Sequence, residues 1–574
     1  MRYGVYPSSR SPAARHSAHH IIRIVSPLTH LLPSSHFLLP SPRITPQEQG
    51  GELVYAGTGS WSTAGRTSKA GATAGKDGVE AENLMGFVTF GALTGVRITT
   101  IVTGCVSSHI VALAADGRSF IWGRNEQSQL GMGHHTNVYN PTPFTVSASD
   151  KVTGGATGSA HTLLTTESGT LYACGKNDYG QCGVGRISPE VSKWAVVPIG
   201  GVTQAAAGRS HSLLLTATRE TYAFGCPECV LQYCCTSARV VVCLARSLAR
   251  ARIWLYFPPR LLPLRRSLTP LPSSSSLLSP TTHTHTHTHR YGQLGNGTDG
   301  KMLERAGKIT FQNEPRPIII DLLVGVPIDA IACGANHCVA ADEEGKVYTW
   351  GFGGYGRLGH GDNKDLHEPK MVEYFANEAK EKPANIPSFM WRSPQPRRAQ
   401  HITTGATATY LIDLNGALYM WGITKKSGEA NMRPAVVDDV SGWSCRSIGC
   451  GNTSTIVAAE KSLITWGPSP TYGELGYGAD GAKSSTRANE VEDIKGSHVI
   501  AVAMGYAHSL AIIDVDQVGA EGDRGRAAVA ALPVYAPEEP DPAVGAAAEA
   551  ESSAKRKSKG KGKGKGKKRA KKDT

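Results

Sequence analysis

A glycine-led pattern that recurs along the chain limits the folds that this sequence can adopt. Seven segments begin with a glycine, continue through a short polar turn and enter a run in which apolar residues alternate with others. Alternation with a period of two predicts half-buried strands. A pattern that recurs at this spacing indicates that one structural unit is used several times. The leading glycines are Gly104, Gly158, Gly208, Gly334, Gly405, Gly451 and Gly505.

Each complete copy of the pattern predicts a β-hairpin. After the first apolar run comes a turn such as Asp116-Gly117, a residue pair that suits the primed turns of hairpins. The second run ends in an aromatic residue and glycine, as in Trp122-Gly123, and a loop of the type Asn-x-x-Gly-Gln-Leu-Gly follows. Because these units are about 50 residues long and contain several short strands, they predict a β-propeller.

The two ends of the repeat region complement each other. The seventh copy stops near Asp514 after one strand, whereas Gly51–Trp61 supplies an isolated strand that ends in Tyr55-Ala56-Gly57. We therefore predict an all-β fold, a seven-bladed β-propeller over residues 51–514, closed by an N-terminal strand. Disordered N- and C-terminal extensions are expected on either side of it.

The third copy is interrupted between Glu228 and Tyr291. Residues 229–290 contain eight arginines and no acidic residue, and they end in alternating His and Thr. Joining "YAFGCPE" directly to "YGQLGNG" makes the third copy regular. We interpret the insert as a retained, in-frame intron; otherwise it is a low-complexity excursion from one blade edge. A mature messenger RNA that encodes these residues would contradict the first interpretation.

Positive charge is concentrated outside the repeats. The chain has 574 residues and a net charge of +13, and residues 555–574 hold twelve Lys or Arg and one Asp. Such a tail can bind the phosphates of a nucleic acid without reading its base sequence, or it can serve as a nuclear import signal. Residues 515–554 are predicted to be a linker, and residues 1–50 a disordered leader. Residues 1–46 resemble either an organelle transit peptide or untranslated sequence. The candidate tail residues are Lys555, Arg556, Lys557, Lys559, Lys561, Lys563, Lys565, Lys567, Lys568, Arg569, Lys571 and Lys572.

Several motifs together resemble a known family. "WGRNEQSQLGMG", "CGKNDYGQCGVG" and "WGFGGYGRLGHG" are similar to the repeat of the regulator of chromosome condensation family, and "VAMGYAHSL" is similar to its telophase-disc branch. The resemblance implies a seven-bladed, non-catalytic scaffold that regulates small GTPases of the Ran, Rac or Arf type. It also implies nuclear location, with chromosome or spindle association in mitosis, and contacts with nucleosomes or microtubules.

The resemblance leaves a second function open. The archetype of the family is a guanine-nucleotide exchange factor for Ran, which acts through a projecting wedge in one blade. No segment here matches that wedge by motif. The connection at residues 301–327 is longer than the others and is expected to project. An exchange factor for a Ran-type GTPase is therefore the alternative to a scaffold.

The remaining motifs predict structure rather than chemistry. "GFGGYG" at residues 351–356 occupies the slot of an inter-strand loop, not a dinucleotide site, and the repeated histidines are expected to be buried and hydrogen-bonded. The CxxxxC pairs Cys333/Cys338 and Cys445/Cys450 are expected to be buried thiols. We predict no catalytic residue, no cofactor, no metal site and no membrane span.

Overall fold

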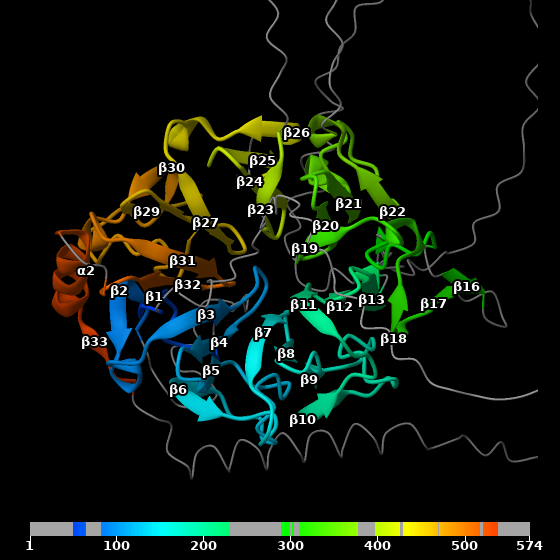
Figure 1. Cartoon of the computed structure of the whole chain (residues 1–574), viewed down its shortest axis with the longest axis horizontal. Coiled ribbons are helices and arrows are strands. Elements are labelled where there is room, and N and C mark those ends of the chain that lie inside the picture. Colours follow the sequence, from blue (N-terminus) through cyan, green and yellow to red (C-terminus); the bar gives the residue numbers. More distant parts are fainter. Residues whose placement is uncertain are drawn as a thin grey trace, which may run out of the picture. The chain divides into compact units, whose positions relative to one another are not determined.

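The computed structural model describes residues 50–62, 64, 82–226, 228–229, 289–290, 292–298, 301–303, 309–376, 397–424, 429–468, 470–516 and 520–537. Seven sheets, antiparallel except for one short edge strand, are arranged around one axis (Figure 1), which confirms the predicted seven-bladed propeller. The blades are numbered here from 1 to 7 along the chain. In each blade the first-named strand is innermost, and the polar turn between the first two strands is the Gly-led turn of the repeat.

Blades 1 to 6 each contain four strands in the order given. Blade 1 consists of β3 (Ile98–Val102), β4 (His109–Ala114), β5 (Ser119–Gly123) and β6 (Val138–Phe144), and blade 2 of β7 (Val152–Thr157), β8 (His161–Thr166), β9 (Leu171–Lys176) and β10 (Glu190–Val196). Blade 3 consists of β11 (Val202–Ala207), β12 (His211–Thr216), β13 (Thr221–Gly225) and β18 (Glu314–Ile319). Blade 4 consists of β19 (Ile328–Cys333), β20 (His337–Asp342), β21 (Val347–Gly351) and β22 (Leu366–Met371). Blade 5 consists of β23 (Ala399–Thr404), β24 (Ala408–Asp413), β25 (Leu418–Gly422) and β26 (Asn431–Val436), and blade 6 of β27 (Cys445–Cys450), β28 (Thr455–Ala459), β29 (Ser462–Gly467) and β30 (Ser485–Glu490).

Blade 7 joins the two ends of the repeat region. Its strands are β31 (Val499–Met504), β32 (His508–Ile513), β1 (Glu52–Gly57), β2 (Leu84–Phe90) and β33 (Val534–Tyr535). The strand β1 pairs with β32 on one side and with β2 on the other. The predicted closure by an N-terminal strand is confirmed, and a second N-terminal strand, β2, extends it.

The repeat glycines and histidines are explained by their register. The histidine that begins the second strand is paired with the glycine that ends the third, as in His109 with Gly123 and His211 with Gly225. Gly123 has a φ of 116°, and a Cβ on it would overlap the backbone of His109. A side chain at the leading Gly158 would overlap the ring of His161 in the same way. Glycine is therefore required at both landmarks.

Apolar side chains from neighbouring sheets fill the space between blades. Trp122, Trp350 and Trp421 directly precede the glycines that end the third strands of blades 1, 4 and 5, and they are fully buried. The Trp350 indole donates a hydrogen bond of 3.0 Å to the carbonyl oxygen of Gln293. Since most strands contribute to two interfaces, the core is a series of inter-blade clusters around the ring.

The interruption begins and ends at one edge of blade 3. At its start, β14 (Glu228–Cys229) pairs antiparallel with β15 (His289–Arg290), which ends it. Further along, β16 (Lys301–Leu303) and β17 (Ile309–Phe311) form a separate two-stranded hairpin before β18 completes the blade. Figure 1 shows this hairpin beyond β18, at the rim of the ring. Residues 230–288 lie outside the described residues.

The segment that follows blade 7 differs from the predicted linker of residues 515–554. Residues Ala520–Ala531 form helix α2, and β33 pairs in parallel with the end of β2. Val529 and Leu532 are buried in the core cluster of blades 6 and 7. The sequence Ala-Glu-Gly-Asp-Arg-Gly-Arg appears low in complexity, yet its few apolar residues cover this core. The linker therefore does not extend through residues 520–537.

Short 3₁₀ turns connect the fourth strand of one blade to the innermost strand of the next. Five of them occupy this position: η1 (Gly91–Leu93), η2 (Asp321–Leu323), η4 (Glu373–Phe375), η5 (Asp438–Val440) and η6 (Glu492–Ile494). A sixth, η3 (Gly354–Gly356), lies in the loop between β21 and β22. The "GFGGYG" loop thus connects two strands, which is the structural context predicted for it and not that of a dinucleotide site.

Candidate interaction faces and central cavity

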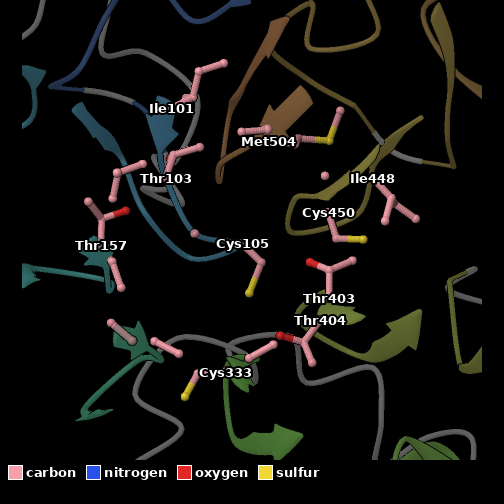
Figure 2. A pocket seen from close by; sticks show the side chains of 18 of the residues that line it. Ile101, Thr103, Cys105, Thr157, Cys333, Thr403, Thr404, Ile448, Cys450 and Met504 are labelled. Atoms are coloured by element: carbon pink, nitrogen blue, oxygen red, sulfur yellow. The ribbon is translucent and has the colours of Figure 1, made fainter. Parts of the chain in front are cut away.

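The innermost strands surround a central cavity of about 210 Å³. Figure 2 shows Thr103, Cys105, Cys333, Cys450 and Met504 among the side chains around it. No carboxylate, lysine or arginine is among its lining residues in the described part of the chain. Burial lowers the pKa of the lining His401, so its neutral form is favoured. This lining offers no acid and base pair for proton transfer.

The repeated histidines hold neighbouring blades together around the cavity. The His109 ring lies 2.7 Å from the Thr162 hydroxyl of the next blade, and His161 lies 3.0 Å from the Ser212 hydroxyl. Where blade 5 has Ala408 in place of histidine, the Tyr410 hydroxyl bonds Thr455 instead. His109, His161, His337 and His508 are buried and hydrogen-bonded, as predicted, whereas Nε2 of His211 is buried without a hydrogen-bond partner among the described residues.

The loop face carries the Gly-led turns and the loops that join the third and fourth strands. An asparagine organises these loops, and in blade 2 the amide of Asn177 donates to the carbonyl of Arg186 and accepts from the backbone of Cys182. Asn125 does the same in blade 1, donating to His134 and accepting from Leu130. The loops are therefore fixed by side chain–backbone bonds, which suits a preorganised binding surface.

The opposite face, called here the acidic face, carries the turns between second and third strands and the 3₁₀ connections. Backbone bonds such as Glu167 N to Lys151 O and Glu343 N to Pro327 O join these two sets of turns. Exposed basic residues there include Arg118, Lys151, Arg397, Lys461 and Lys495. Exposed acidic residues outnumber them: Asp116, Glu167, Asp321, Glu343, Glu344, Glu373, Asp438, Asp439, Glu460, Glu492 and Asp493. This face does not suit a phosphate backbone.

The candidate residues of the basic tail, Lys555–Lys572, lie outside the described residues. The projecting connection predicted at residues 301–327 contains the β16–β17 hairpin, which is paired with no blade among the described strands. The eight cysteines whose side chains the structure describes are free and buried. None of the helices in the described part of the chain is long and apolar enough to cross a membrane.

Comparison with known proteins gives the family. The model of the regulator of chromosome condensation (RCC1) repeat matches residues 116–165, 168–215, 289–341 and 344–412. Protein RCC2 of Mus musculus is 33% identical over 501 residues, which cover 85% of this chain and 80% of that protein. The chain belongs to the regulator of chromosome condensation family, in its RCC2 branch. The matched repeats stop at residue 215 and resume at residue 289, so all but the last two residues of the interruption lie outside them.

Solved structures of the regulator of chromosome condensation fold are similar to the ring. Human WBSCR16 superposes with a TM-score of 0.54 and 18% identity, covering 81% of this chain and 99% of that one. Prp20p of Saccharomyces cerevisiae superposes with a TM-score of 0.53 and 16% identity, covering 83% and 94%. The Prp20p structure is described together with binding of that protein to Gsp1p and histones. At these identities the likeness shows the fold.

Proposed function

We propose that this protein is a non-catalytic propeller scaffold that regulates a small GTPase, and that it acts at chromatin or the spindle in mitosis. The observation that carries the proposal is the 33% identity to protein RCC2 along 85% of the chain. The central cavity lined without carboxylates or lysines, and the fixed loops of the loop face, support a binding role rather than chemistry. Ran-, Rac- and Arf-type GTPases are the proposed partners, with microtubules as a further one.

Nucleotide release tests the proposal. The full chain is added to Ran, Rac and Arf GTPases loaded with a fluorescent nucleotide, and both binding and release are measured. We expect saturable binding to one GTPase without acceleration of its nucleotide release. Binding to none of the three would contradict the proposal.

An exchange factor for a Ran-type GTPase is the second candidate. The fold shared with Prp20p, which binds Gsp1p, and the hairpin β16–β17 at the rim favour it. Acceleration of release on Ran alone would support this function and contradict the scaffold. A chain in which residues 301–311 are replaced by a short Gly-Ser linker is the matched control. It should lose acceleration if the hairpin acts as the wedge.

We propose that the tail residues 555–574 supply the nucleic-acid contact, because the acidic face cannot. Deleting them should abolish binding to duplex DNA. In the full chain, affinity should fall by about 10³-fold between 50 and 200 mM salt if about six phosphates are contacted. A chain with the same tail residues in scrambled order should bind equally, since no bases are read. Equal DNA binding with and without the tail, by fluorescence anisotropy, would contradict this role. Loss of nuclear localisation on deletion would show an import signal in addition.

A further inference from the structure

One blade boundary departs from the histidine–hydroxyl pattern. At three boundaries the repeat histidine bonds a hydroxyl on the second residue of the second strand of the next blade, namely Thr162, Ser212 or Thr409. At the boundary of blades 7 and 1, His508 bonds the Thr103 hydroxyl instead. At the boundary of blades 3 and 4, the residue equivalent to Thr162 is Cys338. The His211 ring therefore faces sulfur where its counterparts face oxygen.

A second thiol lies at the same place. Cys333 is the last residue of β19 and Cys338 the second residue of β20, and the two are direct partners in the antiparallel register. Their sulfurs are 4.0 Å apart. One ligand atom from each of His211, Cys333 and Cys338 lies within 4.8 Å of the others, and all three residues are buried. Within the described residues, this is the only group of three histidine, cysteine or acidic side chains that close together.

The spacing matches a metal centre rather than a disulfide. Two thiolates bound to one zinc ion at about 2.3 Å are about 3.8–4.0 Å apart when the angle at the metal is between tetrahedral and trigonal. A disulfide would require the sulfurs to approach to about 2.0 Å. The 4.0 Å separation, at which one thiol can also hydrogen-bond the other, therefore fits two ligands on a common ion without a change in the backbone.

The imidazole completes the set. The Nε2 atom of His211 is buried without a hydrogen-bond partner of normal geometry, whereas His109, His161 and His337 each use Nε2 to bond a hydroxyl.

We propose that His211, Cys333 and Cys338 bind one Zn²⁺ ion that joins blade 3 to blade 4. Cys333 also lines the central cavity (Figure 2), which provides an entry path and room for a water molecule as the fourth ligand. The Cys338 thiol donates a hydrogen bond of 3.4 Å to the carbonyl oxygen of Gln293, and it would give up this bond on losing its proton to the ion; the same carbonyl oxygen also accepts from the Trp350 indole. The ion would fasten the blade that contains the interruption to its neighbour. This proposal is independent of any GTPase function.

The repeat itself supplies variants that remove ligands without disturbing the fold. Cys338→Ser restores the hydroxyl found as Ser212, and Cys333→Thr restores the residue found as Thr157 and Thr404. Cys450→Thr is the matched control, because Cys450 is the residue of blade 6 that is equivalent to Cys333. The preceding blade, blade 5, has Ala408 where blade 3 has His211, so Cys450 has no histidine from that position beside it.

The test is zinc content by mass spectrometry of the full-length protein, purified with zinc and then desalted. Wild type and Cys450→Thr should retain about one more zinc per chain than Cys338→Ser or Cys333→Thr. The His-Thr tract and the cysteines of the interruption are present in all four proteins, so any zinc they bind cancels in the difference. With Co²⁺ as the probe, a thiolate-to-cobalt charge-transfer band should appear in the first two proteins and be lost or weakened in the others. Equal zinc in wild type and Cys338→Ser, or a Cys333–Cys338 disulfide in the reduced and purified protein, would overturn the proposal.

Discussion

Replacing Val54 with aspartate should prevent the ring from closing. Val54 lies in the centre of β1, is fully buried, and packs in the core cluster of blades 6 and 7. An unpaired carboxylate buried there costs several kcal/mol or takes up a proton, and β1 is the strand on which both β32 and β2 depend. Because whole domains are stable by only about 5–15 kcal/mol, we expect insoluble or aggregated protein. Solubility and size-exclusion chromatography measure the effect.

Two further substitutions in β1 separate closure from general damage. Glu52→Gln, in the same strand but half-buried, should leave the elution volume and the unfolding midpoint unchanged. Val54→Ala should remain folded but less stable by about 1–3 kcal/mol, because it removes apolar contacts without adding charge. A monomeric Val54→Asp protein with the wild-type midpoint would show that β1 does not hold the ring closed.

Acid should unfold the protein between about pH 6.5 and pH 5. Burial is the main cause that lowers the pKa of His109, His161 and His508 from 6.5 to about 3. Below pH 6.5 the unfolded chain binds a proton at each of these histidines while the folded ring does not, so stability is complete above this pH and decreases as pH falls. At pH 5 the loss is about 2 kcal/mol for each histidine and about 6 kcal/mol for the three. Urea unfolding followed by circular dichroism at several pH values measures it.

His161→Ala is the control for this pH dependence, since alanine occupies the equivalent position as Ala408. It should be less stable than wild type at pH 7, where the bond to Ser212 is lost, and its further loss between pH 7 and pH 5 should be smaller by about 2 kcal/mol. The same decrease in both proteins would show that His161 does not take up its proton on unfolding.

The repeat chemistry explains how much of the fold the sequence could predict. Close contacts require glycine at two positions of the repeat: a Cβ would meet the histidine ring at the leading position, as at Gly158, and the paired backbone at the end of the third strand, as at Gly123. These glycines therefore mark the blades in the sequence. Residues 520–537 carry no comparable mark, because α2 contributes few buried side chains, such as Val529 and Leu532. Its packing depends on the core left uncovered by blades 6 and 7, which only the assembled ring defines.

The candidate site was less predictable than the fold. Cys333 and Cys338 could be paired from their spacing, but His211 comes from a different blade, more than 120 residues earlier. Only the ring places its imidazole beside the two thiols. The sequence does contain one indication, since Cys338 occupies a slot in which other copies have Thr162, Ser212 or Thr409. The acidic face likewise results from turns that are dispersed in sequence and gathered by topology.

The position of β1 beside β32 has a consequence for protein synthesis. The two strands are separated by roughly 450 residues, and ribosomes add about 5–20 residues per second. The edge of β1 that pairs with β32 therefore has no partner strand for about 20–90 s after β1 leaves the ribosome. The six complete blades can form in order as they emerge, but the final blade must wait for the end of translation. Nascent chains should therefore need a chaperone on β1 more than on any other strand.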